Sequence, residues 1–203
     1  YVYYTGLFLM ALPSNQDFAT EVKSDRLKIL YRITLAACLA VVLFLMAFGL
    51  SGNIPVNAAL GLFGAVLVLA AGCFLADVLL NRTTLDYAAM AFTLGGVGSV
   101  ALLMTQGDTL ALEVLPFVLP ILVFIVGLLL SPTNSFIVAI LSAVVVFVLP
   151  AAVDGALFTV SIHQVFAIFL TFLSVLLATQ VTGELYQITE WALMNYRNER
   201  ETN

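Results

Sequence analysis

Long apolar runs alternate with short polar breaks along almost the whole chain. A helix rises about 1.5 Å per residue, so about 20 apolar residues cross the hydrocarbon core of a membrane. Six stretches reach or approach that length, namely Leu27–Leu50, Pro55–Leu80, Leu85–Met104, Val114–Leu130, Pro132–Pro150 and Ile162–Val181. The pattern predicts an all-α, polytopic membrane protein with six transmembrane helices.

The polar breaks contain residues that start or distort helices. Thr83 and Asp86 have the spacing of a capping box at the start of the third helix. Ser131, followed by a proline, has the pattern of an N-cap for the fifth. Pro116 and Pro120 lie inside the fourth run, and because proline removes a backbone donor they predict a distortion of its outer half.

Positive charges occur on only one side of this arrangement. They lie before or at the start of the first helix, between the second and the third, or after the sixth, and they are Lys23, Arg26, Lys28, Arg32, Arg82, Arg197 and Arg200. Cytoplasmic loops of membrane proteins carry the excess of Lys and Arg. We therefore expect both termini in the cytoplasm, with an interfacial segment at 1–26, a transmembrane domain at 27–181 and a cytoplasmic helical extension at 182–203.

Composition excludes two classes of protein. Of the 203 residues, 63% are hydrophobic and only 9% are charged, whereas soluble domains carry about 25% charged residues. The formal net charge of −5 argues against nucleic acid, because neutralising phosphates needs clustered bases. We expect membrane lipid as the surrounding solvent and no nucleic-acid partner.

Asp77 is an ionisable residue inside an apolar run, and such residues are functional candidates because their burial in lipid costs at least ~2.5 kcal/mol. It lies about one turn from the predicted cytoplasmic end of the second helix, at a depth similar to that of Arg32 and close to Arg82. A proton or ion site would lie nearer the midplane of the membrane. We therefore predict a structural ion pair of Asp77 with these arginines.

No catalytic or metal-binding motif is visible in the sequence. His163 is the single histidine and opens the sixth helix at the predicted outer interface. An imidazole can hold the metal of a haem or a chlorophyll-type pigment, but a histidine without a partner ligand is more often an interfacial polar residue. The two cysteines lie far apart inside apolar runs, which is the usual place of a packing cysteine. We predict no enzymatic activity and no bound metal.

Small residues predict close helix packing in two places, because they let neighbouring backbones approach each other. In the third helix the small residues are Ala88, Ala91, Gly95, Gly96, Gly98 and Ser99. In the second they are Gly61, Gly64, Ala71 and Gly72. The pattern leaves open whether the partner of each surface lies in the same chain or in another.

The sixth helix carries an unbroken stripe at intervals of three and four residues. It contains Thr171, Ser174, Ala178, Val181, Leu185, Ile188 and Ala192. The stripe is small or weakly polar inside the membrane and larger and apolar beyond Val181, as packing in lipid and then in water requires. Two readings remain: a helix that continues into the cytoplasm to a protein partner, or a short amphipathic tail lying on the membrane with Tyr186 and Trp191 as anchors.

The predicted spans form one block with short loops. The charged segment Lys23-Ser-Asp-Arg-Leu-Lys-Ile-Leu-Tyr-Arg32 precedes this block, and the segment from Gly183 to Arg197 follows it. This arrangement resembles the membrane sensor region of bacterial sensor histidine kinases. The resemblance is architectural. It implies a sensor-type input or anchoring module in the bacterial inner membrane, which pairs with a second copy or with another protein, and it transfers no catalytic residues.

An alternative is an accessory subunit of a photosynthetic or respiratory membrane complex. Its lipid-facing aromatic residues would then contact pigments, quinones or neighbouring subunits. A small transporter is disfavoured, because the chain shows no inverted repeat and no matched pair of broken helices, which secondary transporters commonly have.

Overall fold

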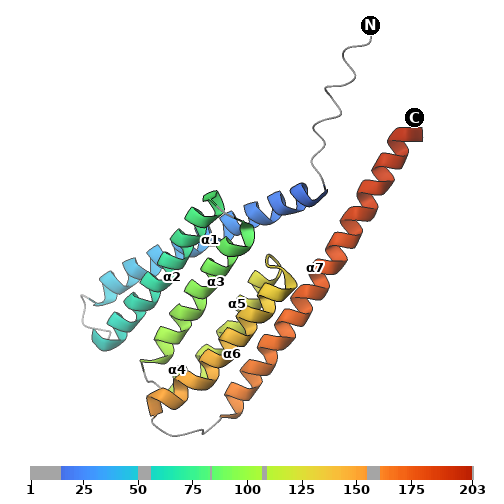
Figure 1. The fold of residues 1–203 in the computed structure, drawn as a ribbon. Coiled ribbons are helices and arrows are strands. Elements are labelled where there is room, and N and C mark those ends of the chain that lie inside the picture. Colours follow the sequence, from blue (N-terminus) through green and yellow to red (C-terminus); the bar gives the residue numbers. More distant parts are fainter. Residues whose placement is uncertain (1–14, 50–55, 83, 107–108, 155–160, 203) are drawn as a thin grey trace.

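The computed structural model describes residues 15–49, 56–82, 84–106, 109–154 and 161–202 (Figure 1). In these ranges every element is a helix and no strand occurs. The elements are α1 (Asn15–Gly49), α2 (Val56–Arg82), α3 (Leu85–Met104), α4 (Thr109–Val114), η1 (Leu115–Phe117), α5 (Val118–Gly127), α6 (Pro132–Asp154) and α7 (Ile162–Thr202). The all-α prediction is confirmed for this part of the chain.

Five helices are long and apolar enough to cross a membrane, namely α1, α2, α3, α6 and α7. The fourth predicted span corresponds to a shorter apolar segment, Leu112–Gly127. These helices support a membrane-embedded protein. The count of six crossings and the cytoplasmic position of both termini remain predictions.

The fourth span is broken rather than continuous. Its backbone passes from α4 through a single 3₁₀ turn, η1, into α5, with Pro116 in the first positions of η1 and Pro120 at the start of α5. A proline provides no N–H for the helix ladder, so two donors are missing within five residues. The predicted distortion is confirmed, whereas the predicted end at Leu130 is wrong, because α5 ends at Gly127.

Three other helix ends differ from the prediction. The first helix begins at Asn15, twelve residues before Leu27, so much of the segment predicted to lie at the interface is a continuation of α1; residues 1–14 are outside the described part. The N-cap of α3 is Thr84, without a side-chain cap bond, and Thr83 is not described. Helix α6 begins at Pro132 as predicted but continues through Pro150 to Asp154.

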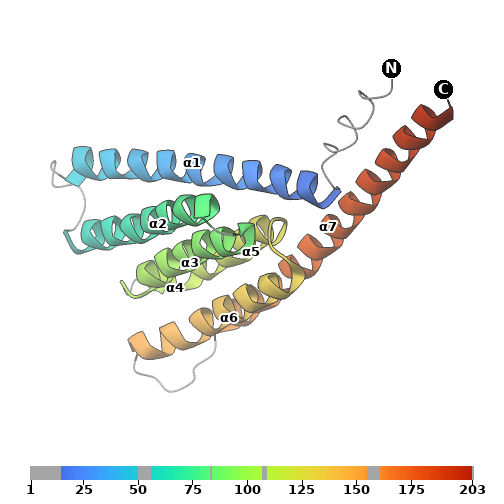
Figure 2. The ribbon, with the colours of Figure 1, turned by 45° about the horizontal axis from the view of Figure 1, so that its top comes forward.

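The helices lie side by side, with α1 at one edge and α6 and α7 at the other (Figure 2). Helix α3 occupies the middle, where it contacts α1, α2, α5 and α6. In its most apolar stretch 56% of the residues are buried, compared with 17–28% in the other four long apolar helices. Helix α1 contacts the bundle along a narrow face whose buried residues are Leu27, Tyr31, Cys38 and Leu45. Most of its other apolar side chains are exposed, as expected of a helix that faces lipid.

Two helix ends project beyond the rest of the bundle on the same side. They are the N-terminal part of α1 and the C-terminal part of α7 (Figures 1 and 2). At 1.5 Å per residue, the 41 residues of α7 extend about 61 Å, roughly twice the thickness of a hydrocarbon core. A large part of α7 therefore extends past any membrane that the other helices would fill.

Candidate functional site

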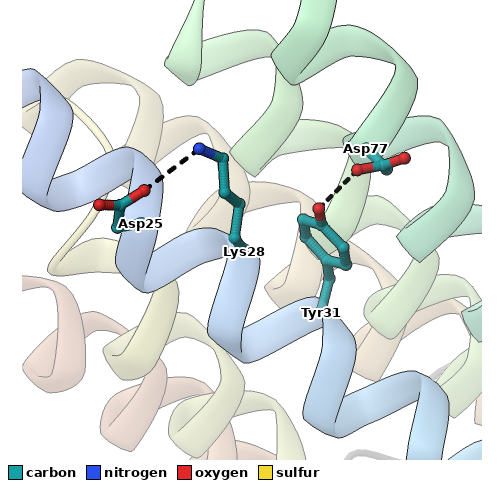
Figure 3. Close-up of polar contacts among 4 residues, drawn as sticks. All are labelled: Asp25, Lys28, Tyr31 and Asp77. Atoms are coloured by element: carbon teal, nitrogen blue, oxygen red, sulfur yellow. Dashed lines mark hydrogen bonds and ion pairs between the residues drawn. The ribbon is translucent and has the colours of Figure 1, made fainter.

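A hydrogen bond joins α1 to α2 near the end of the bundle from which α1 and α7 project. The hydroxyl of Tyr31 donates to Oδ1 of Asp77 at 2.5 Å (Figure 3). Tyr31 is buried, with 5% of its surface exposed. The carboxyl group of Asp77 is therefore held by a side chain of the neighbouring helix.

The predicted ion pair of Asp77 is not formed. Among the residues that the structure describes, neither Arg32 nor Arg82 makes a salt bridge to Asp77, whereas Lys28 pairs with Asp25 at 3.1 Å along α1. Arg32 instead acts electrostatically on the Tyr31 hydroxyl. The direct partner of Asp77 is therefore a tyrosine, and its purely structural role remains a prediction.

A second side-chain hydrogen bond closes the same end of the bundle. Nδ2 of Asn134, in the first turn of α6, donates to Oδ2 of Asp86 in the first turn of α3, at 3.0 Å. Helices α3 and α6 therefore run in the same direction. The loops before them, which were predicted to share the cytoplasmic side, lie at one end of the bundle.

The small residues of α2 and α3 pack against each other. A Cβ added to Gly72 would lie 2.7 Å from the Cα of Gly95 and 3.3 Å from the carbonyl oxygen of Ala91. Ala88 is fully buried and Ser99 is buried to 8% exposure, while a Cβ on Gly98 would lie 3.2 Å from a methyl of Val68. The small-residue surface of the third helix is thus covered by its own chain.

The part of the α7 stripe inside the bundle is also covered by the same chain. Thr171 and Ala178 are buried, and a Cβ added to Gly127 of α5 would lie 2.9 Å from Cβ of Ala178. Ser174 is half-buried. Val181 is 38% exposed, and it marks the point where α7 begins to leave the other helices.

Beyond Val181, α7 continues as a single helix to Thr202. Gly183 is helical, although glycine lowers helix stability, and a Cβ added to it would meet no atom within 4 Å. The side chains of Leu185, Ile188 and Ala192 are outside the described part, but Trp191 is described and is 67% exposed. The continuous backbone agrees with the reading in which the helix continues past Val181; its extension into the cytoplasm and its protein partner remain predictions.

His163 lies in the N-terminal turn of α7. The N–H of Ser161 donates to Oε1 of Gln164 at 3.0 Å, and the N–H of His163 donates to the Ser161 hydroxyl at 3.3 Å. Ser161 thus caps the helix, because its hydroxyl accepts from the second helical residue and its own N–H is bonded by the side chain of the third. The exposed imidazole, whose Nδ1 lies 3.2 Å from the Ser161 hydroxyl, thus has a local role at the start of the helix.

The described residues contain no group of three or more His, Cys, Asp or Glu side chains that could hold a metal ion. Comparison with known proteins found no matching family, no similar curated protein and no similar solved structure.

Proposed function

We propose that this chain is a non-catalytic membrane module, a sensor-type input or anchoring domain, whose output element is α7. The observation that carries the proposal is that α7 is one uninterrupted helix from the bundle to Thr202. A continuous helix transmits a rotation or a shift of its membrane half to its far end. A chain that turned at Gly183 would lose that coupling.

The membrane half of α7 is well placed to receive such a shift. It contacts both α5 and α6, and at Gly127 and Ala178 the contact leaves no room for a further carbon atom. Close-packed helices rearrange between discrete arrangements rather than deform gradually. A change in the broken fourth span or in α6 would therefore be passed to α7.

The far half of α7 provides the contact with a partner. Most of the stability of a helix in a protein comes from packing of its amphipathic face, so an extension that leaves the bundle gains from a partner that buries its apolar stripe. Two copies inserted in one membrane in the same direction would present this stripe in parallel and in register, as in a parallel coiled coil. A different subunit could bury the same residues.

Disulfide crosslinking in native membranes tests the proposal. Leu185→Cys, Ile188→Cys and Ala192→Cys lie on the stripe, whereas Gln187→Cys and Glu190→Cys are matched controls on the rest of the helix. Cys38 and Cys73 are buried and would be replaced by alanine in the background. We expect crosslinked dimers at the three stripe positions and none at the controls.

The accessory-subunit alternative predicts different results in crosslinking and in purification. Exposed aromatic side chains on α7, such as Phe166 (57% exposed) and Phe169 (60% exposed), would then contact a pigment, a quinone or a neighbouring subunit. Mild-detergent purification would yield a stoichiometric second protein or a coloured cofactor, and no self-crosslink. A monomer with neither partner nor crosslink contradicts both readings.

A further inference from the structure

Helices α5, α6 and α7 meet at one tight contact. A Cβ added to Gly127 of α5 would lie 2.9 Å from Cβ of Ala178 of α7 and 3.7 Å from Oγ of Ser135 of α6. One residue from each helix therefore points into this junction. The junction fixes the register of the three helices and shows which face each one turns to the other two.

Two helical turns deeper in the bundle the same three faces present Pro120, Ser142 and Thr171. Residues seven apart return to the same face of a helix, about 10.5 Å further along. Since α6 runs opposite to α5 and α7, the residues at this level come seven positions earlier in the sequence of α5 and α7 and seven positions later in that of α6. Ser142 is 0% exposed and Thr171 is 1% exposed, and Pro120 is buried as well.

The hydrogen bonding at this level is incomplete. Buried hydroxyls elsewhere in the bundle donate to a carbonyl of their own helix, as Thr93 does to Ala89 at 2.6 Å and Thr171 to Ala167 at 2.7 Å. The hydroxyl of Ser142 has no hydrogen-bond partner in the part of the chain that the structure describes. A buried hydroxyl without a partner lowers the stability of the fold by about 1–3 kcal/mol. A further polar group beside Ser142 would remove this cost.

The broken fourth span offers an acceptor at the same depth. Pro120 has no N–H to donate to the carbonyl of Pro116, which lies one turn earlier. That carbonyl accepts from the N–H of Val118, which is shared with the carbonyl of Leu115. A carbonyl oxygen has two lone pairs, so Pro116 retains capacity to accept. Ordered waters and hydroxyl side chains commonly satisfy carbonyls that proline frees in membrane helices.

We propose that Pro120, Ser142 and Thr171 line a binding site for one small neutral hydrogen-bonding guest, an internal water molecule. The water accepts the proton of the Ser142 hydroxyl and donates to the hydroxyl oxygen of Thr171 and to the carbonyl of Pro116. That gives it three hydrogen bonds, the usual number for a buried water. The three lining side chains are uncharged, and a charged guest would be too costly to bury without a partner charge.

A double-mutant cycle tests the site in the purified full chain. Ser142→Ala and Thr171→Val each remove a group that holds the water, and each should lower the melting temperature by about 2–4 °C. Because both variants lose the same guest, the double variant should lose less than the sum. The control pair is Ser142→Ala with Thr93→Val, whose hydroxyl is already bonded within α3; its two shifts should add.

A high-resolution structure of the unaltered protein identifies the guest directly, so this test needs no variant. We expect one isolated solvent peak about 2.7–3.0 Å from the Ser142 hydroxyl. The proposal is overturned if that hydroxyl donates to a carbonyl of α6 and no peak is present. It is overturned equally by density for a larger molecule, or by additive shifts in the Ser142 and Thr171 cycle.

Discussion

Gly72 of α2 and Gly95 of α3 pack backbone against backbone, since a Cβ added to either residue would lie 2.7 Å from the Cα of the other. Glycine at both positions lets the two helix axes approach more closely than any other pair of residues would. In lipid, where no hydrophobic force drives helices together, such van der Waals contact is a main source of association.

Gly95→Ala is therefore expected to destabilise the bundle, because the new methyl group would meet backbone atoms that cannot rotate away. Overpacking of this kind costs about 1–3 kcal/mol. Thermal unfolding in a mild detergent measures the loss. Gly183→Ala is the control, since Gly183 has no neighbour within 4 Å; equal stability of the two variants would contradict the tight contact.

The sequence predicted the features that depend on local chemistry. The apolar runs located the helices, the glycines and alanines of α3 marked its packing surface, and Pro116 and Pro120 marked the broken span. Each of these follows from the residue itself and its near neighbours along the chain. The spacing of the α7 stripe likewise fitted a helix that continues past Gly183, which was one of the two readings that the stripe left open.

Other features depend on which helices become neighbours, and the sequence does not determine that. Tyr31 and Asp77 are separated by 46 positions, and the charged arginines looked like better partners for Asp77 than a tyrosine did. Ser142 looked like any small residue in an apolar run. Its missing partner is visible only after α5, α6 and α7 are brought together in a defined register.

Tyr31→Phe should lower the stability of the protein, because it removes the hydroxyl that donates a hydrogen bond to Asp77 and leaves the ring in place. Loss of a hydrogen bond to a charged group is worth about 1.5–3 kcal/mol. Tyr87→Phe provides the matched control, since Tyr87 is 62% exposed. In a double-mutant cycle with Asp77→Asn, the two losses should be coupled; independent losses would show that the hydrogen bond contributes nothing.

Membrane topology is predicted from the distribution of the seven bases. Single cysteines near Ser51, Asp108 and Asp154 should react with a membrane-impermeant thiol reagent from outside intact cells. Cysteines near Arg82 and Ser131 should react only after the membrane is opened. Arg82 ends α2, and Ser131 follows α5 at the same end of the bundle. Labelling of one position from outside and of the other only from inside would therefore contradict the six-span arrangement.

The last prediction concerns the rigidity of α7 across the membrane boundary. Leu173 and Trp191 are both exposed, and 18 residues amount to five full turns, so spin labels at these positions should lie on one face about 27 Å apart. Replacing Gly183 by alanine removes a residue that costs a helix about 1 kcal/mol, and the distance should stay the same or become narrower in distribution. Replacing it by proline removes a backbone donor and costs about 3 kcal/mol, which should bend the helix and shorten and broaden the distance. Pulsed electron paramagnetic resonance in lipid nanodiscs measures all three proteins. If the unaltered chain already gave the short, broad distribution of the proline variant, the segment after Gly183 would lie along the membrane surface with Trp191 as its anchor, and α7 could not serve as the output element.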